Sequence, residues 1–334
     1  MDEPIPEAPQ SQSFTPSPQP PLLPPRPPQA EHRRRPVWIW YFLGACLLFA
    51  LVGLAGLFMY FAVRSGSGSS GFATIGSGKI AVVSIDGEIT SADTIVAELA
   101  RFNHDSSVKA IIIHIDSPGG GAAASQEIYH EVLRIREQHR KPIVASIESV
   151  GASGAYYVAS AADKIYANQA SVVGSIGVIM EWTNYGKLFK WARLKSEVIH
   201  AGALKDAGDP TRPMTPQERV YFQGLVNNMY GQFIHDVAVG RHLPVATVRP
   251  IATGQVWTGE QALPMHLIDK IGGFRVALLD TARSVGISGE PGIVRPVVRR
   301  RSLWDILASD PGTLFPNPGK IIARHTGFYF LWRG

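Results

Sequence analysis

Residues 37–63 form a continuous run without any charged side chain, and this run constrains the fold more than any other feature. At about 1.5 Å per helical residue, its length exceeds the ~30 Å thickness of the hydrocarbon core of a bilayer. Aromatic residues stand at both ends, Trp38 and Trp40 at one and Tyr60 at the other, as they do at membrane interfaces. The sequence therefore predicts a membrane-spanning helix.

Arginine residues are distributed unequally around this run. Arg33, Arg34 and Arg35 precede it, whereas Arg64 alone follows it closely. Because basic residues accumulate on the cytoplasmic side of a membrane helix, we expect a cytoplasmic N-terminus and an extracytoplasmic main domain. The polar stretch ahead of the run is longer than an ordinary signal peptide, and no Ala-x-Ala cleavage site follows. We therefore expect an uncleaved, single-pass anchor in the lipid bilayer.

The segments around the anchor and the main domain are interpreted from their composition. Residues 1–36 are rich in proline and are predicted to be a disordered cytoplasmic tail. Residues 64–78, rich in glycine and serine, are predicted to be a flexible linker to a folded domain at 79–288. The basic and aromatic segment 289–334 is expected to be a terminal packing segment. Contact with anionic lipid, packing on a neighbouring chain and insertion into an active-site groove are the alternatives.

The composition argues against nucleic acid, metal and cofactor as partners. The formal net charge is +5, without the aromatic-interleaved basic motif of nucleic-acid binding. The single cysteine, Cys46, excludes an internal disulfide, and its position within the apolar run argues against a cysteine metal site. The glycines before Lys79 resemble a phosphate loop. However, Ala73 replaces the first required glycine and Ile80 the required Ser or Thr.

Apolar runs of strand length alternate with helical patterns through the main domain. This order predicts an α/β fold with a parallel sheet, in which the turns after the strands meet at one edge. Gly120 and Ser153 each follow an expected strand and should share that edge. The expected strands are 79–85, 109–116, 142–147, 164–167, 172–180 and 194–200. The expected helices are 94–102, 122–139, 215–241, 258–266 and 274–284.

Ser153 stands between Ala152 and Gly154, at a turn between an expected strand and an expected helix. Backbone N–H groups converge at such a turn, and they can stabilise the oxyanion that forms when a serine attacks a carbonyl. The glycine-rich turn at residues 117–121 offers further N–H groups. The alternative interpretation is a small-residue helix packed tightly on the sheet, without a catalytic role.

A nucleophilic serine requires a base, and histidine is the first candidate. His114 and His130 are the nearest histidines, and Asp116 could complete a Ser-His-Asp arrangement. His114 lies within a strand pattern, however, which fits a structural role better.

Lysine is the other known base for a serine nucleophile. A lysine can act as a base at neutral pH only when burial lowers its pKa from the ordinary value of ~10.4. Lys205 stands among small and apolar residues that would permit burial. The neighbouring Asp206 and Asp209 would favour the charged form of an amine close to them.

Five motifs share their order and spacing with one known family. They are DSPGGG at 116–121, ASGAYY at 152–157, VGSIG at 173–177, KDAGDPTRPM at 205–214 and VWTGEQA at 256–262. With them the chain resembles the membrane-anchored signal peptide peptidases of the SppA type, relatives of the Clp protease in the crotonase-like superfamily. The resemblance covers residues 79–288 and the anchor. It implies a crotonase/Clp protease-like βα superhelix in the short, single-repeat form, held in the bacterial inner (cell) membrane.

The same resemblance implies an activity and a set of site residues. The activity is that of a serine endopeptidase that degrades remnant signal peptides or other apolar peptides outside the cytoplasm. The implied homo-oligomer shares each catalytic dyad between adjacent protomers. Ala155 departs from the family, which usually has a second glycine there, but its methyl group touches neither catalytic residue. The implied roles are nucleophile for Ser153, general base for Lys205, support of the lysine for Ser175, and oxyanion hole for Gly120 and Gly154.

Two other functions are compatible with the same fold. A crotonase-type acyl-thioester enzyme would share the oxyanion hole, but it needs a carboxylate acid or base and an adenine-binding surface, and the predicted membrane topology argues against it. A non-catalytic membrane scaffold would be unaffected by Ser153→Ala and Lys205→Ala. Loss of activity in both variants would exclude the scaffold.

Overall fold

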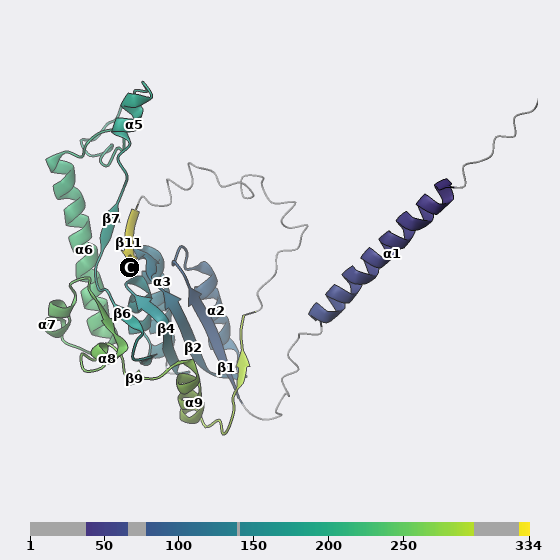
Figure 1. Ribbon diagram of the computed structural model, residues 1–334. Helices are drawn as coiled ribbons and strands as arrows, with labels where there is room; N and C mark the ends of the chain where they lie inside the picture. Colours follow the sequence, from purple (N-terminus) through teal and green to yellow (C-terminus); the bar gives the residue numbers. More distant parts are fainter. Residues whose placement is uncertain (1–37, 66–77, 139–140, 297–326) are drawn as a thin grey trace, which may run out of the picture. The chain divides into compact units, whose positions relative to one another are not determined.

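The computed structural model describes residues 38–65, 78–138, 141–296 and 327–334. The chain divides into two compact units, one ending at Phe72 and one starting at Ala73. Helix α1 (Trp38–Ser65) belongs to the first unit (Figure 1). Its segment Trp40–Leu57 has a mean hydropathy of 2.1 and is long and apolar enough to cross a membrane. The predicted tail 1–36, and most of the predicted linker and C-terminal segment, lie outside the described residues.

The second unit is built on an eight-stranded, mostly parallel sheet, which confirms the predicted α/β class. Its main path is β10-β1-β2-β4-β5-β9. Strand β6 pairs in parallel with the last residues of β4 and antiparallel with β8. The strands are β1 (Lys79–Asp86), β2 (Val108–Ser117), β4 (Ile143–Ala152), β5 (Lys164–Ala167), β6 (Val172–Gly174), β8 (Val256–Thr258), β9 (Lys270–Ile271) and β10 (Gly292–Val294).

Helices cover both faces of this sheet, because successive residues of a strand point to opposite faces. On one face, Val83 and Ile113 belong to the larger core, which includes residues of the helices α2, α3, α4 and α6. On the other face, Val82 and Ile112 pack with residues of α9. These helices are α2 (Asp93–His104), α3 (Ala122–Glu137), α4 (Gly154–Ser160), α6 (Pro216–Gly240) and α9 (Phe274–Ser284). The shorter ones are α5 (Gly186–Trp191), α7 (Val245–Val248), η1 (Arg249–Ile251) and α8 (Gly259–Ala262).

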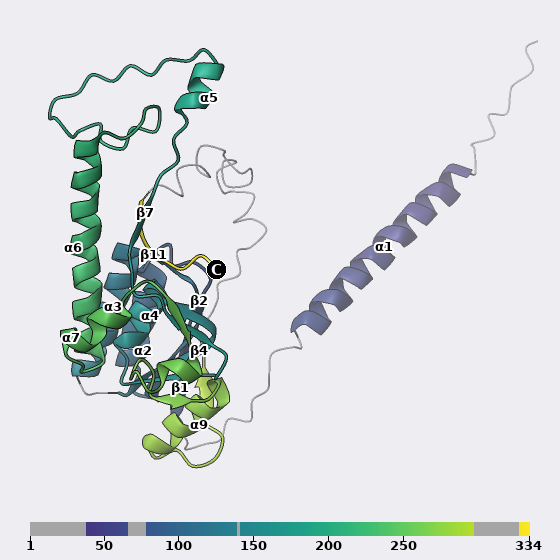
Figure 2. The same cartoon turned by 60° about the vertical axis from the view of Figure 1, so that its left-hand side comes forward.

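Helix α6 begins where the sequence predicts. The Thr215 side chain accepts a hydrogen bond from the Glu218 N–H, the Glu218 side chain accepts one from the Thr215 N–H, and Pro216 follows the cap. The residues 182–215, which carry α5 and lead into α6, are called the arm below. Figures 1 and 2 both show α5 and the first turns of α6 projecting beyond the main sheet.

A second, smaller sheet joins three distant parts of the chain. Its order is β3-β11-β7, with antiparallel pairing on both sides of β11. The strands are β3 (Gly119–Gly121), β7 (Ile179–Glu181) and β11 (Gly327–Leu331). Figures 1 and 2 show β11 beside β7 at the edge of the main sheet where α6 passes.

Two predicted strands are wrong. The expected strand 172–180 is divided between the two sheets, because the backbone turns sharply at Gly174 and Ser175, with φ values of 90° and 52°. The expected strand 194–200 has no regular secondary structure. Its Val198 and Ile199 side chains are 52% and 101% exposed, so this apolar run does not enter the core.

Candidate active site

Ser153 lies at the turn between β4 and α4, at the C-terminal edge of the main sheet. Its backbone has φ 54° and ψ −118°, a conformation that costs a non-glycine residue about 1–3 kcal/mol. The Ser153 N–H donates to the Gly174 carbonyl at 2.7 Å, and the Ser153 carbonyl accepts from the Tyr157 N–H at 2.8 Å. These two hydrogen bonds hold the strained turn and thereby fix the direction of the Ser153 Cα–Cβ bond.

Strand β3, the glycine-rich turn after β2, is held on one side by Ile89. The Ile89 N–H donates to the Gly119 carbonyl, and the Gly121 N–H donates to the Ile89 carbonyl, both at 2.8 Å. Because N–H groups of successive residues in a strand point to opposite sides, the N–H of Gly120 points away from these partners. It therefore faces β11, where Phe330 is its register partner.

Gly120 and Gly154 lie side by side, although 33 residues separate them in the sequence. A Cβ atom placed on Gly154 would be 3.2 Å from the Gly120 nitrogen and 3.0 Å from the Phe330 carbonyl oxygen. A Cβ on Gly119 would collide with that same oxygen and lie 2.6 Å from the Gly154 nitrogen. A carbonyl oxygen thus already sits among the three glycines, where an oxyanion would need N–H donors.

Ser175 is brought to the same place as Ser153. Its hydroxyl donates to the Gly254 carbonyl at 3.1 Å, and its N–H donates to the Gln255 carbonyl at 2.9 Å. Both serines are buried and line one cavity of about 630 Å³, whose walls also include Tyr230, Leu331 and Trp332. The predicted nucleophile and the predicted supporting serine therefore face a common space.

Lys205 is not part of this cavity within one chain. It is exposed on the arm and lines a separate cavity of about 570 Å³. Among the described residues, the two cavities share no lining residue. A single chain therefore places Ser153 and Lys205 in different cavities.

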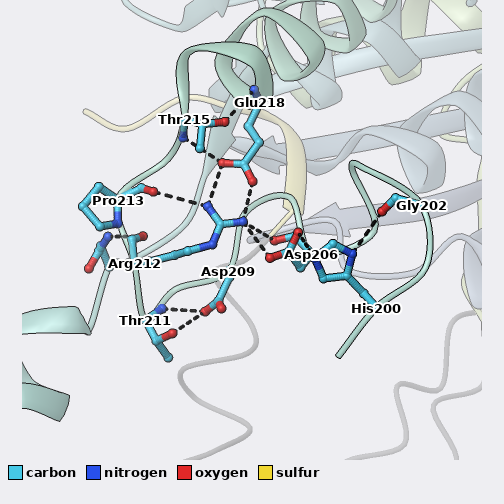
Figure 3. A network of polar contacts seen from close by, with 10 residues as sticks. His200, Gly202, Asp206, Asp209, Thr211, Arg212, Pro213, Thr215 and Glu218 are labelled. Atoms are coloured by element: carbon cyan, nitrogen blue, oxygen red, sulfur yellow. Dashed lines mark hydrogen bonds and ion pairs between the residues drawn. The ribbon is translucent and has the colours of Figure 1, made fainter. Parts of the chain in front are cut away.

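A polar network fixes the part of the arm that carries Lys205 (Figure 3). The Arg212 guanidinium donates to Asp206 at 2.9 Å and to both carboxylate oxygens of Glu218, at 2.5 and 3.0 Å. His200 lies 3.4 Å from the other oxygen of Asp206. Hydrogen bonds from Arg212 lower the pKa of Glu218 to about 2 and hold the pKa of Asp206 below its ordinary value. The network anchors the loop beside Lys205 to the first turn of α6.

The histidine alternative finds no support in the geometry. His114 Nε2 lies 3.6 Å from a Glu148 carboxylate oxygen, and its ring packs edge-on against Phe274 of α9. Asp116 accepts a hydrogen bond from the Val150 N–H at 3.0 Å. None of these residues lines the Ser153 cavity as the structure describes it. His114 therefore has a structural environment on the opposite side of the sheet.

The sequence prediction missed two features of this region. The link from Arg212 to Glu218 and Asp206 was not expected, although all three residues lie close together in the sequence. The C-terminal strand was expected only to pack as a terminal segment, with the groove as one alternative. The structure places it in the groove, where Leu331, Trp332 and Arg333 line the Ser153 cavity. The continuous aromatic and apolar run at residues 328–332 was the available signal for a buried strand.

A strained serine at the edge of a parallel sheet, beside converging glycine N–H groups, defines the class of α/β serine hydrolases. A model of peptidase family S49 matches residues 135–288. A putative protease of Methanocaldococcus jannaschii is 38% identical over 190 residues, 57% of this chain and 60% of that protein. A putative protease of Synechocystis is 36% identical over 195 residues, 58% of this chain and 70% of that protein.

A third relative carries a more specific name. The putative signal peptide peptidase SppA of Enterococcus faecium is 33% identical over 177 residues, 53% of this chain and 51% of that protein. The matched region thus spans between about half and 70% of these three relatives. The chain belongs to peptidase family S49, as its resemblance to the SppA-type peptidases predicted.

Proposed function

We propose that the protein is a serine endopeptidase with Ser153 as nucleophile and Lys205 as general base. The observation that carries the proposal is the carbonyl oxygen of Phe330 lying between Gly120 and Gly154, at the cavity that Ser153 lines. A substrate carbonyl at this position would meet the two glycine N–H groups next to the nucleophile. Ser175, in the same cavity, is available to orient the lysine amine.

The reaction follows from these positions. The Ser153 hydroxyl oxygen attacks the peptide carbonyl carbon, and its proton passes to the neutral Lys205 amine. The N–H groups of Gly120 and Gly154 stabilise the oxyanion, a contribution of about 10²–10³ in rate for each such donor. The proton then passes to the leaving amine, and water activated by Lys205 hydrolyses the acyl-enzyme.

Because Ser153 and Lys205 line separate cavities within one chain, we propose a homo-oligomer with a shared dyad. The arm of one protomer would carry Lys205 to the Ser153 cavity of its neighbour. Apolar side chains on the arm support this, because they remain exposed in the single chain: Leu188 at 56%, Trp191 at 82% and Leu194 at 60%. Val198 and Ile199, which line the same cavity as Lys205, are also exposed, at 52% and 101%. Covering them would exclude water from Lys205, which a neutral amine requires.

The proposed location follows from α1 and from the charge around it. One apolar helix ahead of the peptidase domain fits a single-pass anchor, with the arginines at 33–35 on the cytoplasmic side. The active site would then face the extracytoplasmic side. Remnant signal peptides and other apolar peptides near the membrane are the substrates that this arrangement would meet.

The test is complementation between two inactive variants of the full-length protein in detergent. Ser153→Ala and Lys205→Ala should each abolish cleavage of a fluorogenic apolar peptide. Subunits exchanged in an equal mixture should recover about a quarter of wild-type activity. Each shared site takes its serine from one subunit and its lysine from the next subunit of a repeating head-to-tail interface. In an equal mixture each of these residues is intact in about half of the subunits, so about a quarter of the sites have both.

Three outcomes would count against parts of the proposal. Two inactive variants that never complement, despite demonstrated subunit exchange, would refute the shared dyad. An active Lys205→Ala variant would refute the assigned base. A folded, oligomeric wild-type protein that cleaves no peptide, and whose Ser153 does not react with a fluorophosphonate probe, would refute the peptidase function itself.

A further inference from the structure

Two carboxylates next to Lys205 would oppose its proposed role as a base. Asp206 and Asp209 line the same cavity of about 570 Å³ as the lysine. A carboxylate within about 4–6 Å of an amine favours the charged, protonated form of that amine. A protonated lysine cannot accept the proton of a serine hydroxyl. A lysine base at this position therefore requires that both carboxylates be held away from its amine.

In the structure both carboxylates are bound by other groups. The Arg212 guanidinium donates to an Asp206 carboxylate oxygen at 2.9 Å and to the Asp206 backbone carbonyl at 3.1 Å. The N–H and the hydroxyl of Thr211 both donate to one carboxylate oxygen of Asp209, each at 2.7 Å. Within the described ranges of the chain, no hydrogen bond or ion pair joins the Lys205 amine to either carboxylate.

Arg212 is the partner that can hold Asp206 under the conditions in which a lysine acts as a base. His200 Nε2 lies 3.4 Å from the other Asp206 oxygen, but its Nδ1 lies 3.1 Å from the Gly202 carbonyl oxygen. A neutral imidazole has a single N–H, and the carbonyl can only accept it, so Nε2 can donate to Asp206 only from the charged ring. The guanidinium keeps its charge at every pH at which an enzyme works. As the pH rises and the histidine ring loses its charge, Asp206 therefore depends on Arg212.

Glu218 fixes the orientation of Arg212. Its two carboxylate oxygens accept from the guanidinium at 2.5 and 3.0 Å, and its side chain is 4% exposed. One of these oxygens also accepts from the Thr215 N–H at the cap of α6, at 2.8 Å. Figure 3 shows the guanidinium between Glu218 on one side and Asp206 on the other. Because a bidentate pair of this kind is geometrically specific, the helix holds Arg212 in the orientation that reaches Asp206.

The cavity that Lys205 would enter adds no further carboxylate. On the proposed shared dyad, this is the Ser153 cavity of a neighbouring protomer. In the part of the chain that the structure describes, the titratable residues lining that cavity are Tyr230 and Arg333. The carboxylates able to keep Lys205 protonated are therefore those of the arm itself.

We propose that Arg212 is a positioning residue for Lys205, which binds the Asp206 carboxylate and keeps it from the lysine amine so that the amine can act as a base. This inference rests on the proposed Ser-Lys function and names the group that makes the lysine usable. Without Arg212, Asp206 is free to turn within the shared cavity and pair with the amine. The amine then loses its proton only at higher pH.

The test is the dependence of kcat/KM on pH, which reports the ionisation of the base in the free enzyme. Full-length protein in detergent cleaves a fluorogenic apolar peptide across the neutral and alkaline range. Arg212→Gln should move the rising limb of the profile to higher pH by about one unit or more. Arg212→Gln/Asp206→Asn should return the limb to its wild-type position, although it also lacks the arginine. A purely structural role of Arg212 would lower the activity without moving the limb.

Two further sets of variants serve as controls. Arg275→Gln removes an arginine from an exposed ion pair with Glu290 and should leave the profile unchanged. Arg212→Gln leaves the buried Glu218 carboxylate without its cation, so the comparison is repeated in a Glu218→Gln background, where glutamine preserves the helix cap. There, Arg212→Gln should again move the limb to higher pH, and the further substitution Asp206→Asn should again reverse the shift. This second series keeps the test decisive if the first variant does not fold.

The outcomes separate this inference from the proposed function. A profile of Arg212→Gln that coincides with the wild-type profile would overturn the inference and leave the peptidase function intact. A shift that persists after the substitution Asp206→Asn would also overturn it, because the carboxylate would not be its cause. A folded wild-type protein that neither cleaves the peptide nor reacts with a fluorophosphonate probe would remove the proposed function, and the positioning role with it.

Discussion

Replacing Gly154 by alanine would test the oxyanion hole without disturbing the rest of the fold. The new Cβ atom would collide with the Ser125 hydroxyl, lie 3.0 Å from the carbonyl oxygen at Phe330, and lie 3.2 Å from the Gly120 nitrogen. A carbon and a carbonyl oxygen ordinarily approach to about 3.3–3.6 Å. The methyl group would therefore push a bound carbonyl a few tenths of an ångström away from its donors.

The expected magnitudes differ sharply between activity and stability. Loss of one oxyanion donor lowers kcat by about 10²–10³, or about 2.7–4 kcal/mol. The substituted residue keeps its N–H and only displaces the bound carbonyl, and since a misplacement of about 1 Å costs about 10²-fold, we expect a fall of about 10–10². The backbone of Gly154 is helical, so alanine should stabilise it by about 0.5–1 kcal/mol. The Ser125 side chain would rotate away from the new methyl group and lose its 3.0 Å hydrogen bond to the Gly121 carbonyl. This loss costs about 1 kcal/mol of stability and offsets the gain from alanine. The melting temperature should therefore change little.

The assay compares kcat/KM for a fluorogenic peptide and the melting temperature of full-length protein in detergent. Gly121→Ala is the matched control, because a Cβ at Gly121 meets nothing closer than the Ile89 carbonyl oxygen at 3.6 Å. It should keep near-normal activity. The assignment of the oxyanion hole would be refuted if Gly154→Ala lost less than about tenfold in kcat/KM, or if Gly121→Ala lost as much.

Three further changes probe the rest of the fold. The Arg212 hydrogen bonds lower the pKa of Glu218 from 4.5 to about 2, so their stabilisation is present above pH 4.5 and is lost as pH falls toward 2. The difference in melting temperature between wild type and Arg212→Gln should therefore narrow from pH 7 to pH 3, and a constant difference would contradict this. Tyr156→Phe removes a buried hydroxyl that donates to the Leu267 carbonyl at 2.8 Å, which should cost about 1–3 kcal/mol in urea unfolding. Ser146→Ala should be neutral or stabilising by up to about 1 kcal/mol. Its buried hydroxyl has no hydrogen-bond partner within the described parts of the chain, and measurable destabilisation would show a missed contact.

Local patterns predicted much of the main domain, because they depend on neighbours in the sequence. The apolar runs of β1 and β2 predict buried strands, since both faces of a parallel sheet are covered by helices. The start of α6 follows from Thr215 and Glu218, which cap the helix over a single turn. Gly120 and Ser153 were expected at one edge of the sheet, because parallel strands all end at the same edge.

The wrong predictions occur where local composition and burial disagree. Residues 194–200 have the apolar content of a strand, yet Ile199 is fully exposed in the single chain. If the dyad is shared between subunits, as we propose, residues 194–200 are buried against a neighbouring subunit rather than against the sheet of their own chain. Composition alone does not distinguish these two kinds of burial.

Local periodicity and short motifs were sufficient to predict the class of fold, the family and the residue types available for catalysis, because all three depend on residues that are close together in the sequence. Tertiary structure alone decided that Ser153 and Ser175 share a cavity while Lys205 lies apart on the arm. The tertiary structure also pairs residues 329–331 with the glycine strand β3 and residues 327–329 with β7, both far away in the sequence. Such pairings depend on the backbone edges and pockets that remain open after the main sheet has formed, and no neighbouring residues in the sequence specify them.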